Sequence, residues 1–170
     1  MSEIERLMSQ GVVFGPAVVC YFMKGDKVLL GLRKKVSLGL GKDLYAGIGG
    51  KVGDSEELKN ETPEEALIRE TFEEIKAKIL KFKKMGRVRF IQPTKPQWQY
   101  DVVVYVVDEW EGEPQETTVI KPVWFDTSNL PISQMWDDNL YFVPKVLSGE
   151  EVNAIFLLDE NSKVTEYIFE

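Results

Sequence analysis

Short apolar segments separated by turn residues recur along the chain, and this pattern is typical of a protein built largely on β-strands. Between residues 79 and 91, apolar and polar positions alternate. Residues 100–107 contain the densest group of β-branched side chains, which favours a strand near the centre of a sheet. The predicted strands cover residues 12–23, 28–32, 79–91, 100–107, 123–125, 155–158 and 164–169.

Two longer segments have the spacing of helices, and the first of them begins with clear signals. Thr62 and Glu65 have the spacing of a capping box, and Pro63 occupies the favoured first helical position. A second helix is predicted over residues 137–147, closed by Gly149, and residues 1–11 form a short helix or an arm. The loops between elements are predicted at residues 24–27, 37–42, 93–97 and 109–114.

Strands and helices in this order favour one α/β domain over residues 1–170, with a mixed sheet sandwiched between helices. The first long helix carries three acidic residues, Glu70, Glu73 and Glu74, at positions i, i+3 and i+4. Their carboxylates project from one side of the helix, where like charges repel by roughly 0.2–0.5 kcal/mol per pair. A divalent cation with oxygen ligands would offset this repulsion, and Mg²⁺ is commonly held by carboxylates together with substrate phosphates.

Other residues near the acidic helix agree with a metal site. Gly47, Gly49 and Gly50 allow the backbone to pass close to such a site, and Arg69 can orient a carboxylate through a bidentate pair. The alternative is a solvated acidic helix face, which is the usual meaning of such a charge pattern.

Composition excludes several classes of function. The chain contains no histidine, which excludes Ser-His and Cys-His catalysis and histidine metal sites. Its net charge of −7 argues against broad electrostatic binding to nucleic acids or anionic membranes. Cys20 is the only cysteine and lies in an apolar segment, so we expect a core residue. Without an apolar secretory segment near the N-terminus, a cytoplasmic location is expected.

The segment from Arg69 to Glu74, preceded by the glycine loop and by Glu61, resembles the Nudix box. Similarity to the MutT-type 8-oxo-dGTPase branch of the Nudix hydrolase superfamily extends over about residues 17–169. The motifs that carry it are Val28-Leu29-Leu30-Gly31, Gly49-Gly50-Lys51-Val52, Lys121-Pro122, Trp124-Phe125, Met135-Trp136 and Glu166-Tyr167. The resemblance implies a Nudix fold and Mg²⁺-dependent release of pyrophosphate from a nucleoside triphosphate, with Mn²⁺ as a possible substitute.

The resemblance also implies roles for individual residues. The catalytic residues would be Glu70, Glu73, Glu74 and Arg69, and the three glutamates would bind the metal together with the Gly50 carbonyl. Glu70 is the candidate general base. Arg69 and Glu61 would brace the loop and helix. The implied substrate-binding residues are Arg33, Gly49, Lys51, Phe90, Trp136, Asp138 and Asn139, with Trp136 stacking on the base and Asp138 reading the purine edge.

Several positions depart from the family pattern. Residues 52–60 contain an insertion of roughly five residues, and Lys76 replaces a glycine after the helix. Because a left-handed non-glycine residue costs roughly 1–2 kcal/mol, we expect this helix to end differently. Ala46 replaces an asparagine and Asn139 an aspartate, both of which contact the base; Leu158 replaces an aromatic, and Val119 replaces a glutamate that some members use, with Glu116 nearby.

The resulting hypothesis is a nucleotide-pool hydrolase for oxidised purine triphosphates such as 8-oxo-dGTP. Two alternatives remain open: a Nudix hydrolase of a dinucleoside polyphosphate or nucleotide sugar, and a nucleotide-binding module without catalysis. The expected partner is a small nucleotide, with no nucleic acid or membrane, and the oligomeric state is left open between monomer and homodimer.

Overall fold

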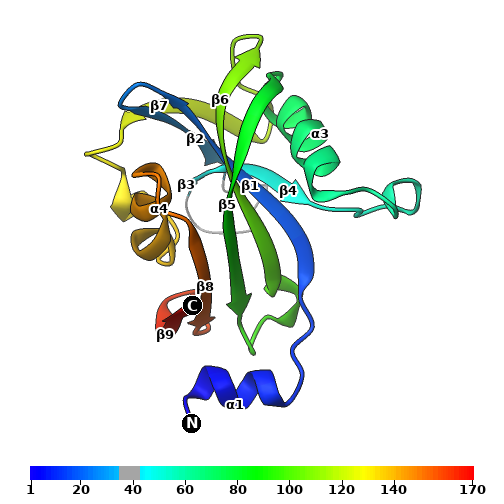
Figure 1. The fold of residues 1–170 in the computed structure, drawn as a ribbon, viewed down its shortest axis with the longest axis vertical. Coiled ribbons are helices and arrows are strands. Elements are labelled where there is room, and N and C mark those ends of the chain that lie inside the picture. The colour runs from blue at the N-terminus through cyan, green and yellow to red at the C-terminus, as the bar shows by residue number, and fades with distance from the viewer. Residues whose placement is uncertain (35–42) are drawn as a thin grey trace.

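The computed structural model describes residues 1–34 and 43–170, so the predicted loop at 37–42 lies outside the described residues. Within these residues the sheet has nine strands; seven of them follow the order β3-β2-β1-β6-β5-β8-β9, while β4 pairs with β1 and β7 with β2. The β1–β6 and β5–β8 pairs are parallel and the others are antiparallel, as expected for a mixed sheet (Figure 1). The strands are β1 (Gly15–Lys24), β2 (Lys27–Arg33), β3 (Leu44–Ala46), β4 (Ile48–Lys51), β5 (Lys78–Ile91), β6 (Tyr100–Glu111), β7 (Ile120–Asp126), β8 (Val152–Leu158) and β9 (Val164–Phe169).

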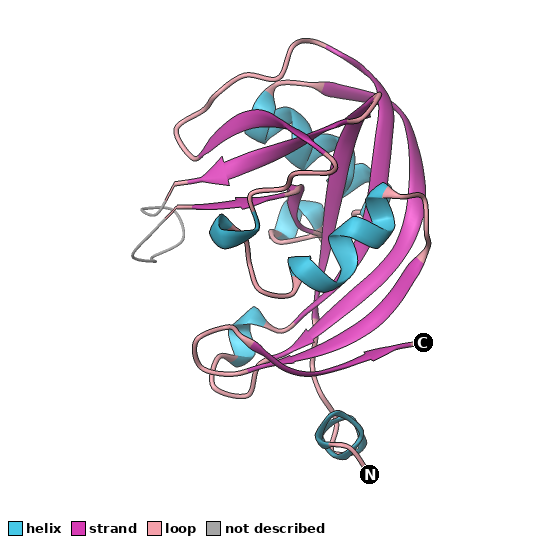
Figure 2. Cartoon of the chain, turned by 90° about the vertical axis from the view of Figure 1, so that its left-hand side faces the viewer, coloured by secondary structure: helices cyan, strands magenta, loops and turns pink. Residues whose placement is uncertain are grey.

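In residues 1–34 and 43–170, three α-helices pack on the sheet: α1 (Glu3–Ser9), α3 (Pro63–Ile75) and α4 (Asn139–Leu147). Short 3-10 helices lie at Glu56–Leu58, Pro96–Trp98 and Ile132–Gln134. Helical segments lie on both sides of the twisted sheet, as predicted (Figure 2). No helix in the described part of the chain is long and apolar enough to cross a membrane.

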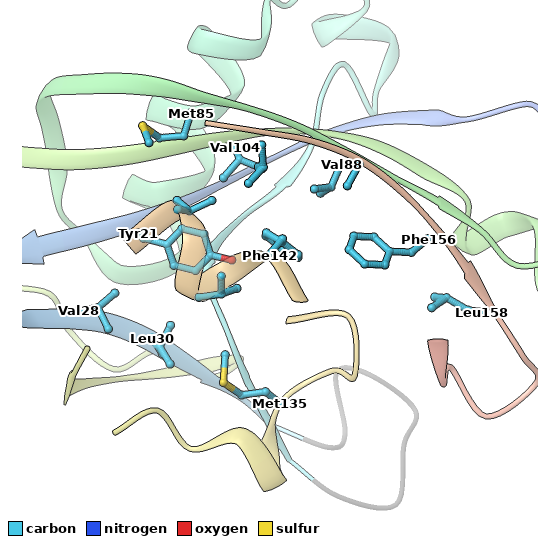
Figure 3. Packing of buried hydrophobic residues seen from close by; sticks show 14 residues of the cluster. Tyr21, Val28, Leu30, Met85, Val88, Val104, Met135, Phe142, Phe156 and Leu158 are labelled. Atoms are coloured by element: carbon cyan, nitrogen blue, oxygen red, sulfur yellow. The ribbon is translucent and has the colours of Figure 1, made fainter. Parts of the chain in front are cut away.

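The two faces of β1 show how the sheet separates two cores. Cys20 and Phe22 pack with Leu67 of α3, whereas Tyr21 packs with Phe142 of α4. Successive side chains of a strand point to opposite faces, so α3 and α4 cover opposite faces of the sheet. Figure 3 shows Tyr21 and Phe142 within the α4-side core. Cys20 is fully buried, and burial raises the pKa of its thiol to about 12, which confirms a core residue.

The beginning of α3 is as predicted, but its end is not. Thr62 and Glu65 form the reciprocal capping box, with Pro63 in the first turn. At the C-terminus Lys76 adopts the left-handed conformation, with φ 61°, and its N–H donates to the Phe72 carbonyl at 3.0 Å. The expectation of a different ending was wrong. The chain must reverse here because β5 begins two residues later, and this demand outweighs the cost of a left-handed lysine.

Two other boundaries differ from the prediction. The predicted loop at 109–114 is wrong at its start, because β6 continues to Glu111 and pairs there with β5. The helix predicted from residue 137 begins at Asn139. Asp137 instead accepts a hydrogen bond from the Val164 N–H at 2.8 Å, which ties the start of α4 to β9. The remaining predicted strands are present, mostly with longer ends, because hydrogen bonding between strands continues past the apolar segments.

Candidate active site

One cavity of about 530 Å³ collects most of the predicted site residues from distant parts of the chain. We call one part of its lining the acidic region and define it by Arg33, Gly49, Gly50, Lys51 and Glu74. The aromatic region of the same cavity is defined by Phe90, Gln92, Trp98, Trp136, Asp138 and Asn139. A cavity of this size is ordinary for a small-molecule site.

Arg69 fixes the glycine loop to α3. Its guanidinium donates to both Glu61 oxygens, with Nε–Oε2 at 2.6 Å and Nη2–Oε1 at 2.9 Å, and also to the Lys51 carbonyl at 3.2 Å. Its Nη1 donates to Glu70 Oε1 at 3.1 Å and to Glu73 Oε2 at 3.2 Å. Hydrogen bonds from Arg69 lower the pKa of Glu61. The predicted pairing of Arg69 with Glu61 is therefore present, and one arginine organises three glutamates.

Arg33 holds Glu74 from the opposite side of the site. Its Nη1 and Nη2 donate to the two carboxylate oxygens at 3.1 Å each, and Nη2 also donates to the Gly49 carbonyl at 3.1 Å. The Glu74 side chain is only 12 % exposed. An arginine fork binds a carboxylate in fixed geometry, so β2 and α3 are joined at the cavity wall.

The glycines of β4 are required by close packing. A Cβ on Gly49 would lie 2.0 Å from the Val18 carbonyl oxygen, and one on Gly50 would lie 2.5 Å from the Glu70 carboxylate carbon. Any side chain at Gly50 would therefore displace Glu70. The glycine pair places the loop backbone directly against the acidic helix, as the close-approach argument predicted.

The carboxylates of α3 are unequally exposed. The side chains of Glu70 and Glu74 are each 12 % exposed, whereas that of Glu73 is 58 % exposed. Burial raises the pKa of both Glu70 and Glu74, and the charge of Glu74 raises that of Glu70 further. Among residues 1–34 and 43–170, no three acidic or thiol side chains form a preassembled metal cluster. The donor chemistry still fits a hard divalent cation, which would offset both the burial and the mutual repulsion of these carboxylates.

Aromatic side chains dominate the other part of the cavity. Trp136 and Trp98 meet edge to face, with ring centroids 6.2 Å apart and an interplanar angle of 80°. Phe90 lines the cavity and also stacks on Phe156 of the core at 5.9 Å, so its ring lies between the cavity and the core. Exposed aromatic faces offer stacking surfaces for a flat heterocycle.

Asp138 and Asn139 form a buried polar pair in the aromatic region. They are 6 % and 7 % exposed, and Asn139 Nδ2 donates to Asp138 Oδ2 at 3.0 Å. Burial raises the pKa of Asp138 to about 7, and the charge of Asp137 also contributes to the rise. Near neutral pH this carboxyl group can therefore donate or accept a hydrogen bond.

Several cavity residues were not singled out by sequence reasoning. Gln92 and Ser162 are buried, and Trp98 and Tyr100 lie at or beside the turn before β6. The available signal was the strand alternation, which places Gln92 on the same face as Phe90. Ala46 and Leu158, two positions that depart from the family pattern, also line the cavity, whereas Glu116 pairs with Lys34 at 3.0 Å.

Comparisons with known proteins agree with this geometry. The NUDIX domain model matches residues 13–146. The chain is 32 % identical over 141 residues to the oxidized purine nucleoside triphosphate hydrolase of Danio rerio, covering 83 % of this chain and 85 % of that protein. It is 28 % identical over 145 residues to the protein of the same name from Mus musculus, covering 85 % and 87 %.

Solved structures show the same fold. A MutT protein from Bacillus halodurans superposes with a TM-score of 0.73 at 18 % identity, covering 92 % of this chain and 98 % of that one. A Nudix hydrolase from Nitrosomonas europaea gives a TM-score of 0.62 at 15 % identity, covering 82 % of this chain and 92 % of that one. The acidic helix, its arginine and its glycine loop lie within the matched segment, and the chain belongs to the Nudix family of hydrolases.

Proposed function

We propose that this Nudix hydrolase converts oxidised purine nucleoside triphosphates into monophosphates and pyrophosphate. The observation that carries the proposal is the continuity of the cavity, in which a charged lining with Glu74, Arg33 and the glycine loop meets an aromatic lining. A nucleoside triphosphate has the matching division into a charged chain and a flat ring. The names of the relatives from Danio rerio and Mus musculus support the same substrate class.

The acidic region, together with Glu70 and Glu73 of α3, which do not themselves line the cavity, would hold the divalent cation on which Nudix hydrolases generally depend. We assign Mg²⁺, replaceable by Mn²⁺, to Glu70, Glu73, Glu74 and the Gly50 carbonyl. When bound, such a cation neutralises phosphate charge and lowers the pKa of a coordinated water. The residues of the chain supply the frame: Arg69 orients Glu70 and Glu73, Arg33 positions Glu74, and Glu70 is the candidate base for the attacking water.

The aromatic region would bind the base. Trp136 offers a stacking face, and the Asp138–Asn139 pair offers hydrogen-bonding groups for the purine edge. Arg33, Gly49 and Lys51 line the cavity beside the carboxylates, where sugar and phosphates would lie. A pocket built on buried polar groups discriminates strongly, because a mismatched base leaves one of them without a partner.

A panel of nucleotides assayed for pyrophosphate release with Mg²⁺ tests the proposal. We expect a higher kcat/KM for 8-oxo-dGTP or 2-hydroxy-dATP than for dGTP and dATP. The panel also includes a dinucleoside polyphosphate and a nucleotide sugar, because the missing side-chain amide at Ala46 permits a different base or substituent. Equal rates on oxidised and parent nucleotides, or faster cleavage of the other diphosphate derivatives, would reject the substrate assignment.

A further inference from the structure

Gln92 is a buried polar side chain in the wall of the cavity. It follows the last residue of β5 and is 1 % exposed. Val88, Phe90 and Gln92 all line the cavity, whereas Ile91 packs in a separate core with α1 residues. Because alternate residues of a strand share a face, the side chain of Gln92 is directed to the cavity side of the sheet.

The amide of Gln92 is held in one orientation by the turn between β8 and β9. Its Nε2 donates to the Asp159 carbonyl at 2.8 Å and to Ser162 Oγ at 3.0 Å. A carbonyl oxygen can only accept, so the nitrogen and oxygen of this amide cannot exchange places without losing the bond. The turn itself is well fixed, because Asp159 Oδ1 accepts from the N–H groups of Asn161 and Lys163 at 2.8 and 3.0 Å.

The Oε1 of Gln92 has no donor within the described protein, in contrast to its Nε2. The Gln92 backbone N–H is also occupied, since it donates to Gln99 Oε1 at 3.0 Å. This leaves one acceptor of fixed polarity in the cavity wall. The Asp138–Asn139 pair has no such fixed polarity, because Asp138 can donate or accept and an asparagine amide carries both kinds of group.

Oxidation of a purine at C8 changes the hydrogen-bonding character of its imidazole edge. In the parent base N7 is an acceptor, whereas the 8-oxo base carries an N7–H donor. An acceptor of fixed polarity accepts a hydrogen bond from the N7–H of the 8-oxo base and repels the N7 lone pair of the parent base. The substrate preference proposed above requires a group that senses this change.

We propose that Gln92 Oε1 accepts the N7–H of an 8-oxopurine, which makes Gln92 a specificity-determining residue. This inference rests on the proposed function. The Asp159 carbonyl and Ser162 act as positioning groups, since they orient the amide without contacting the base. Loss of one hydrogen bond and of the opposing repulsion is expected to change relative affinity about three- to tenfold.

The first test uses the wild-type protein and calorimetric titration with three monophosphates. We expect the order of affinity 8-oxo-dGMP, then 7-deaza-dGMP, then dGMP, because the deaza compound replaces the repelled N7 acceptor by a carbon. Weaker binding of 7-deaza-dGMP than of dGMP would show that N7 meets a donor and would overturn the inference.

The second test compares Gln92→Met with Gln10→Met. Methionine keeps the volume without the acceptor, so the ratio of kcat/KM for 8-oxo-dGTP over dGTP should fall about three- to tenfold in Gln92→Met. Gln10 is an exposed glutamine after α1 that does not line the cavity, so the same change there should leave the ratio within about twofold of wild type. A merely structural role of Gln92 would lower both rates together and keep the ratio.

The outcomes separate this inference from the proposed function. A wild-type enzyme without preference for 8-oxo-dGTP rejects both. A wild-type preference that survives Gln92→Met, in a variant that unfolds at a normal temperature, rejects only the role of Gln92. Should Gln92→Met fail to fold, the order of affinities of the three monophosphates for the wild-type protein still tests the role of Gln92.

Discussion

The acidic and aromatic regions share one cavity but are built in different ways. Most of the acidic region comes from β4 and the following helix, and its side chains are held by two arginines in charged hydrogen bonds. The aromatic region comes from β5, the turn before β6 and the start of α4, and it is held by packing and by neutral hydrogen bonds to the β8–β9 turn. The first region is therefore fixed by local sequence and charge, and the second by the whole fold.

The largest effect on turnover is expected when a charge of the acidic region is removed. Glu74→Gln should lower Mg²⁺-dependent turnover by about a hundredfold or more, because an amide cannot replace a carboxylate as a ligand for a hard cation. The melting temperature should change little, because burial raises the pKa of Glu74, unlike that of Glu61, so relief of the cost of burying this charge offsets the weaker bond to Arg33. Glu57→Gln, an exposed change in the insertion, is the matched control and should keep full turnover. Near-normal turnover of Glu74→Gln would remove the metal-site proposal.

A smaller effect is expected from breaking the brace between the loop and α3. Glu61→Gln should lower the free energy of unfolding by about 2–3 kcal/mol, because Arg69 loses its charged partner at a carboxylate only 5 % exposed. The control is Asp101→Asn, which removes a bidentate partner of Arg87 in a more exposed pair and should cost less than about 1 kcal/mol. Urea unfolding measures both, and equal losses would show that burial of the brace does not matter.

In the aromatic region, removal of a stacking face should act on substrate affinity alone. Trp136→Ala should raise KM about five- to a hundredfold, because stacking of a base on an aromatic ring contributes about 1–3 kcal/mol. Trp136→Phe keeps a smaller aromatic face, so its KM should lie between those of Trp136→Ala and the wild type. Steady-state kinetics with 8-oxo-dGTP decides, and an unchanged KM in the alanine variant would place the base elsewhere.

The contrast between the regions also explains how far the sequence was informative. The capping box and the glycine approach lie within about 25 residues, where helix geometry and spacing are enough to predict contact, and the family resemblance supplied the nearby Arg69–Glu61 pair. The Arg33–Glu74 pair joins residues 41 positions apart and depends on the register of β2 against the rest of the sheet.

The polar groups of the aromatic region were harder to predict. A glutamine after a strand and a serine in a turn have no local pattern that shows their contact across 70 positions. At Lys76 a local rule was outweighed by the chain reversal into β5. The Nudix resemblance supplied Trp136 and Asp138, but it had no information on Gln92, which only the fold brings to the cavity.

The ionisation of Asp138 predicts a pH dependence in the aromatic region. Its pKa is raised from 3.8 to about 7, so the folded protein binds more protons than the unfolded chain between about pH 4 and pH 7. Stability should therefore fall as pH rises through this window and level off above it. Asp138→Asn should remove this part of the slope, as measured by thermal unfolding from pH 4 to 8. Parallel curves for the two proteins would show that Asp138 is ionised throughout.

The smallest expected effect concerns the end of the acidic helix. Lys76→Gly should raise the free energy of unfolding by roughly 0.5–1 kcal/mol. Glycine adopts the left-handed φ of 61° without strain, and its greater freedom in the unfolded chain offsets part of this gain. Lys76→Ala is the control, since it also removes the lysine contact with the Phe72 ring but keeps the strained backbone. If glycine and alanine have equal stability, the backbone at this position is not strained, and the lysine is as suitable as the glycine of the family pattern. A gain confined to glycine, without a change in KM for 8-oxo-dGTP, would show that the end of the helix can be altered independently of the aromatic region.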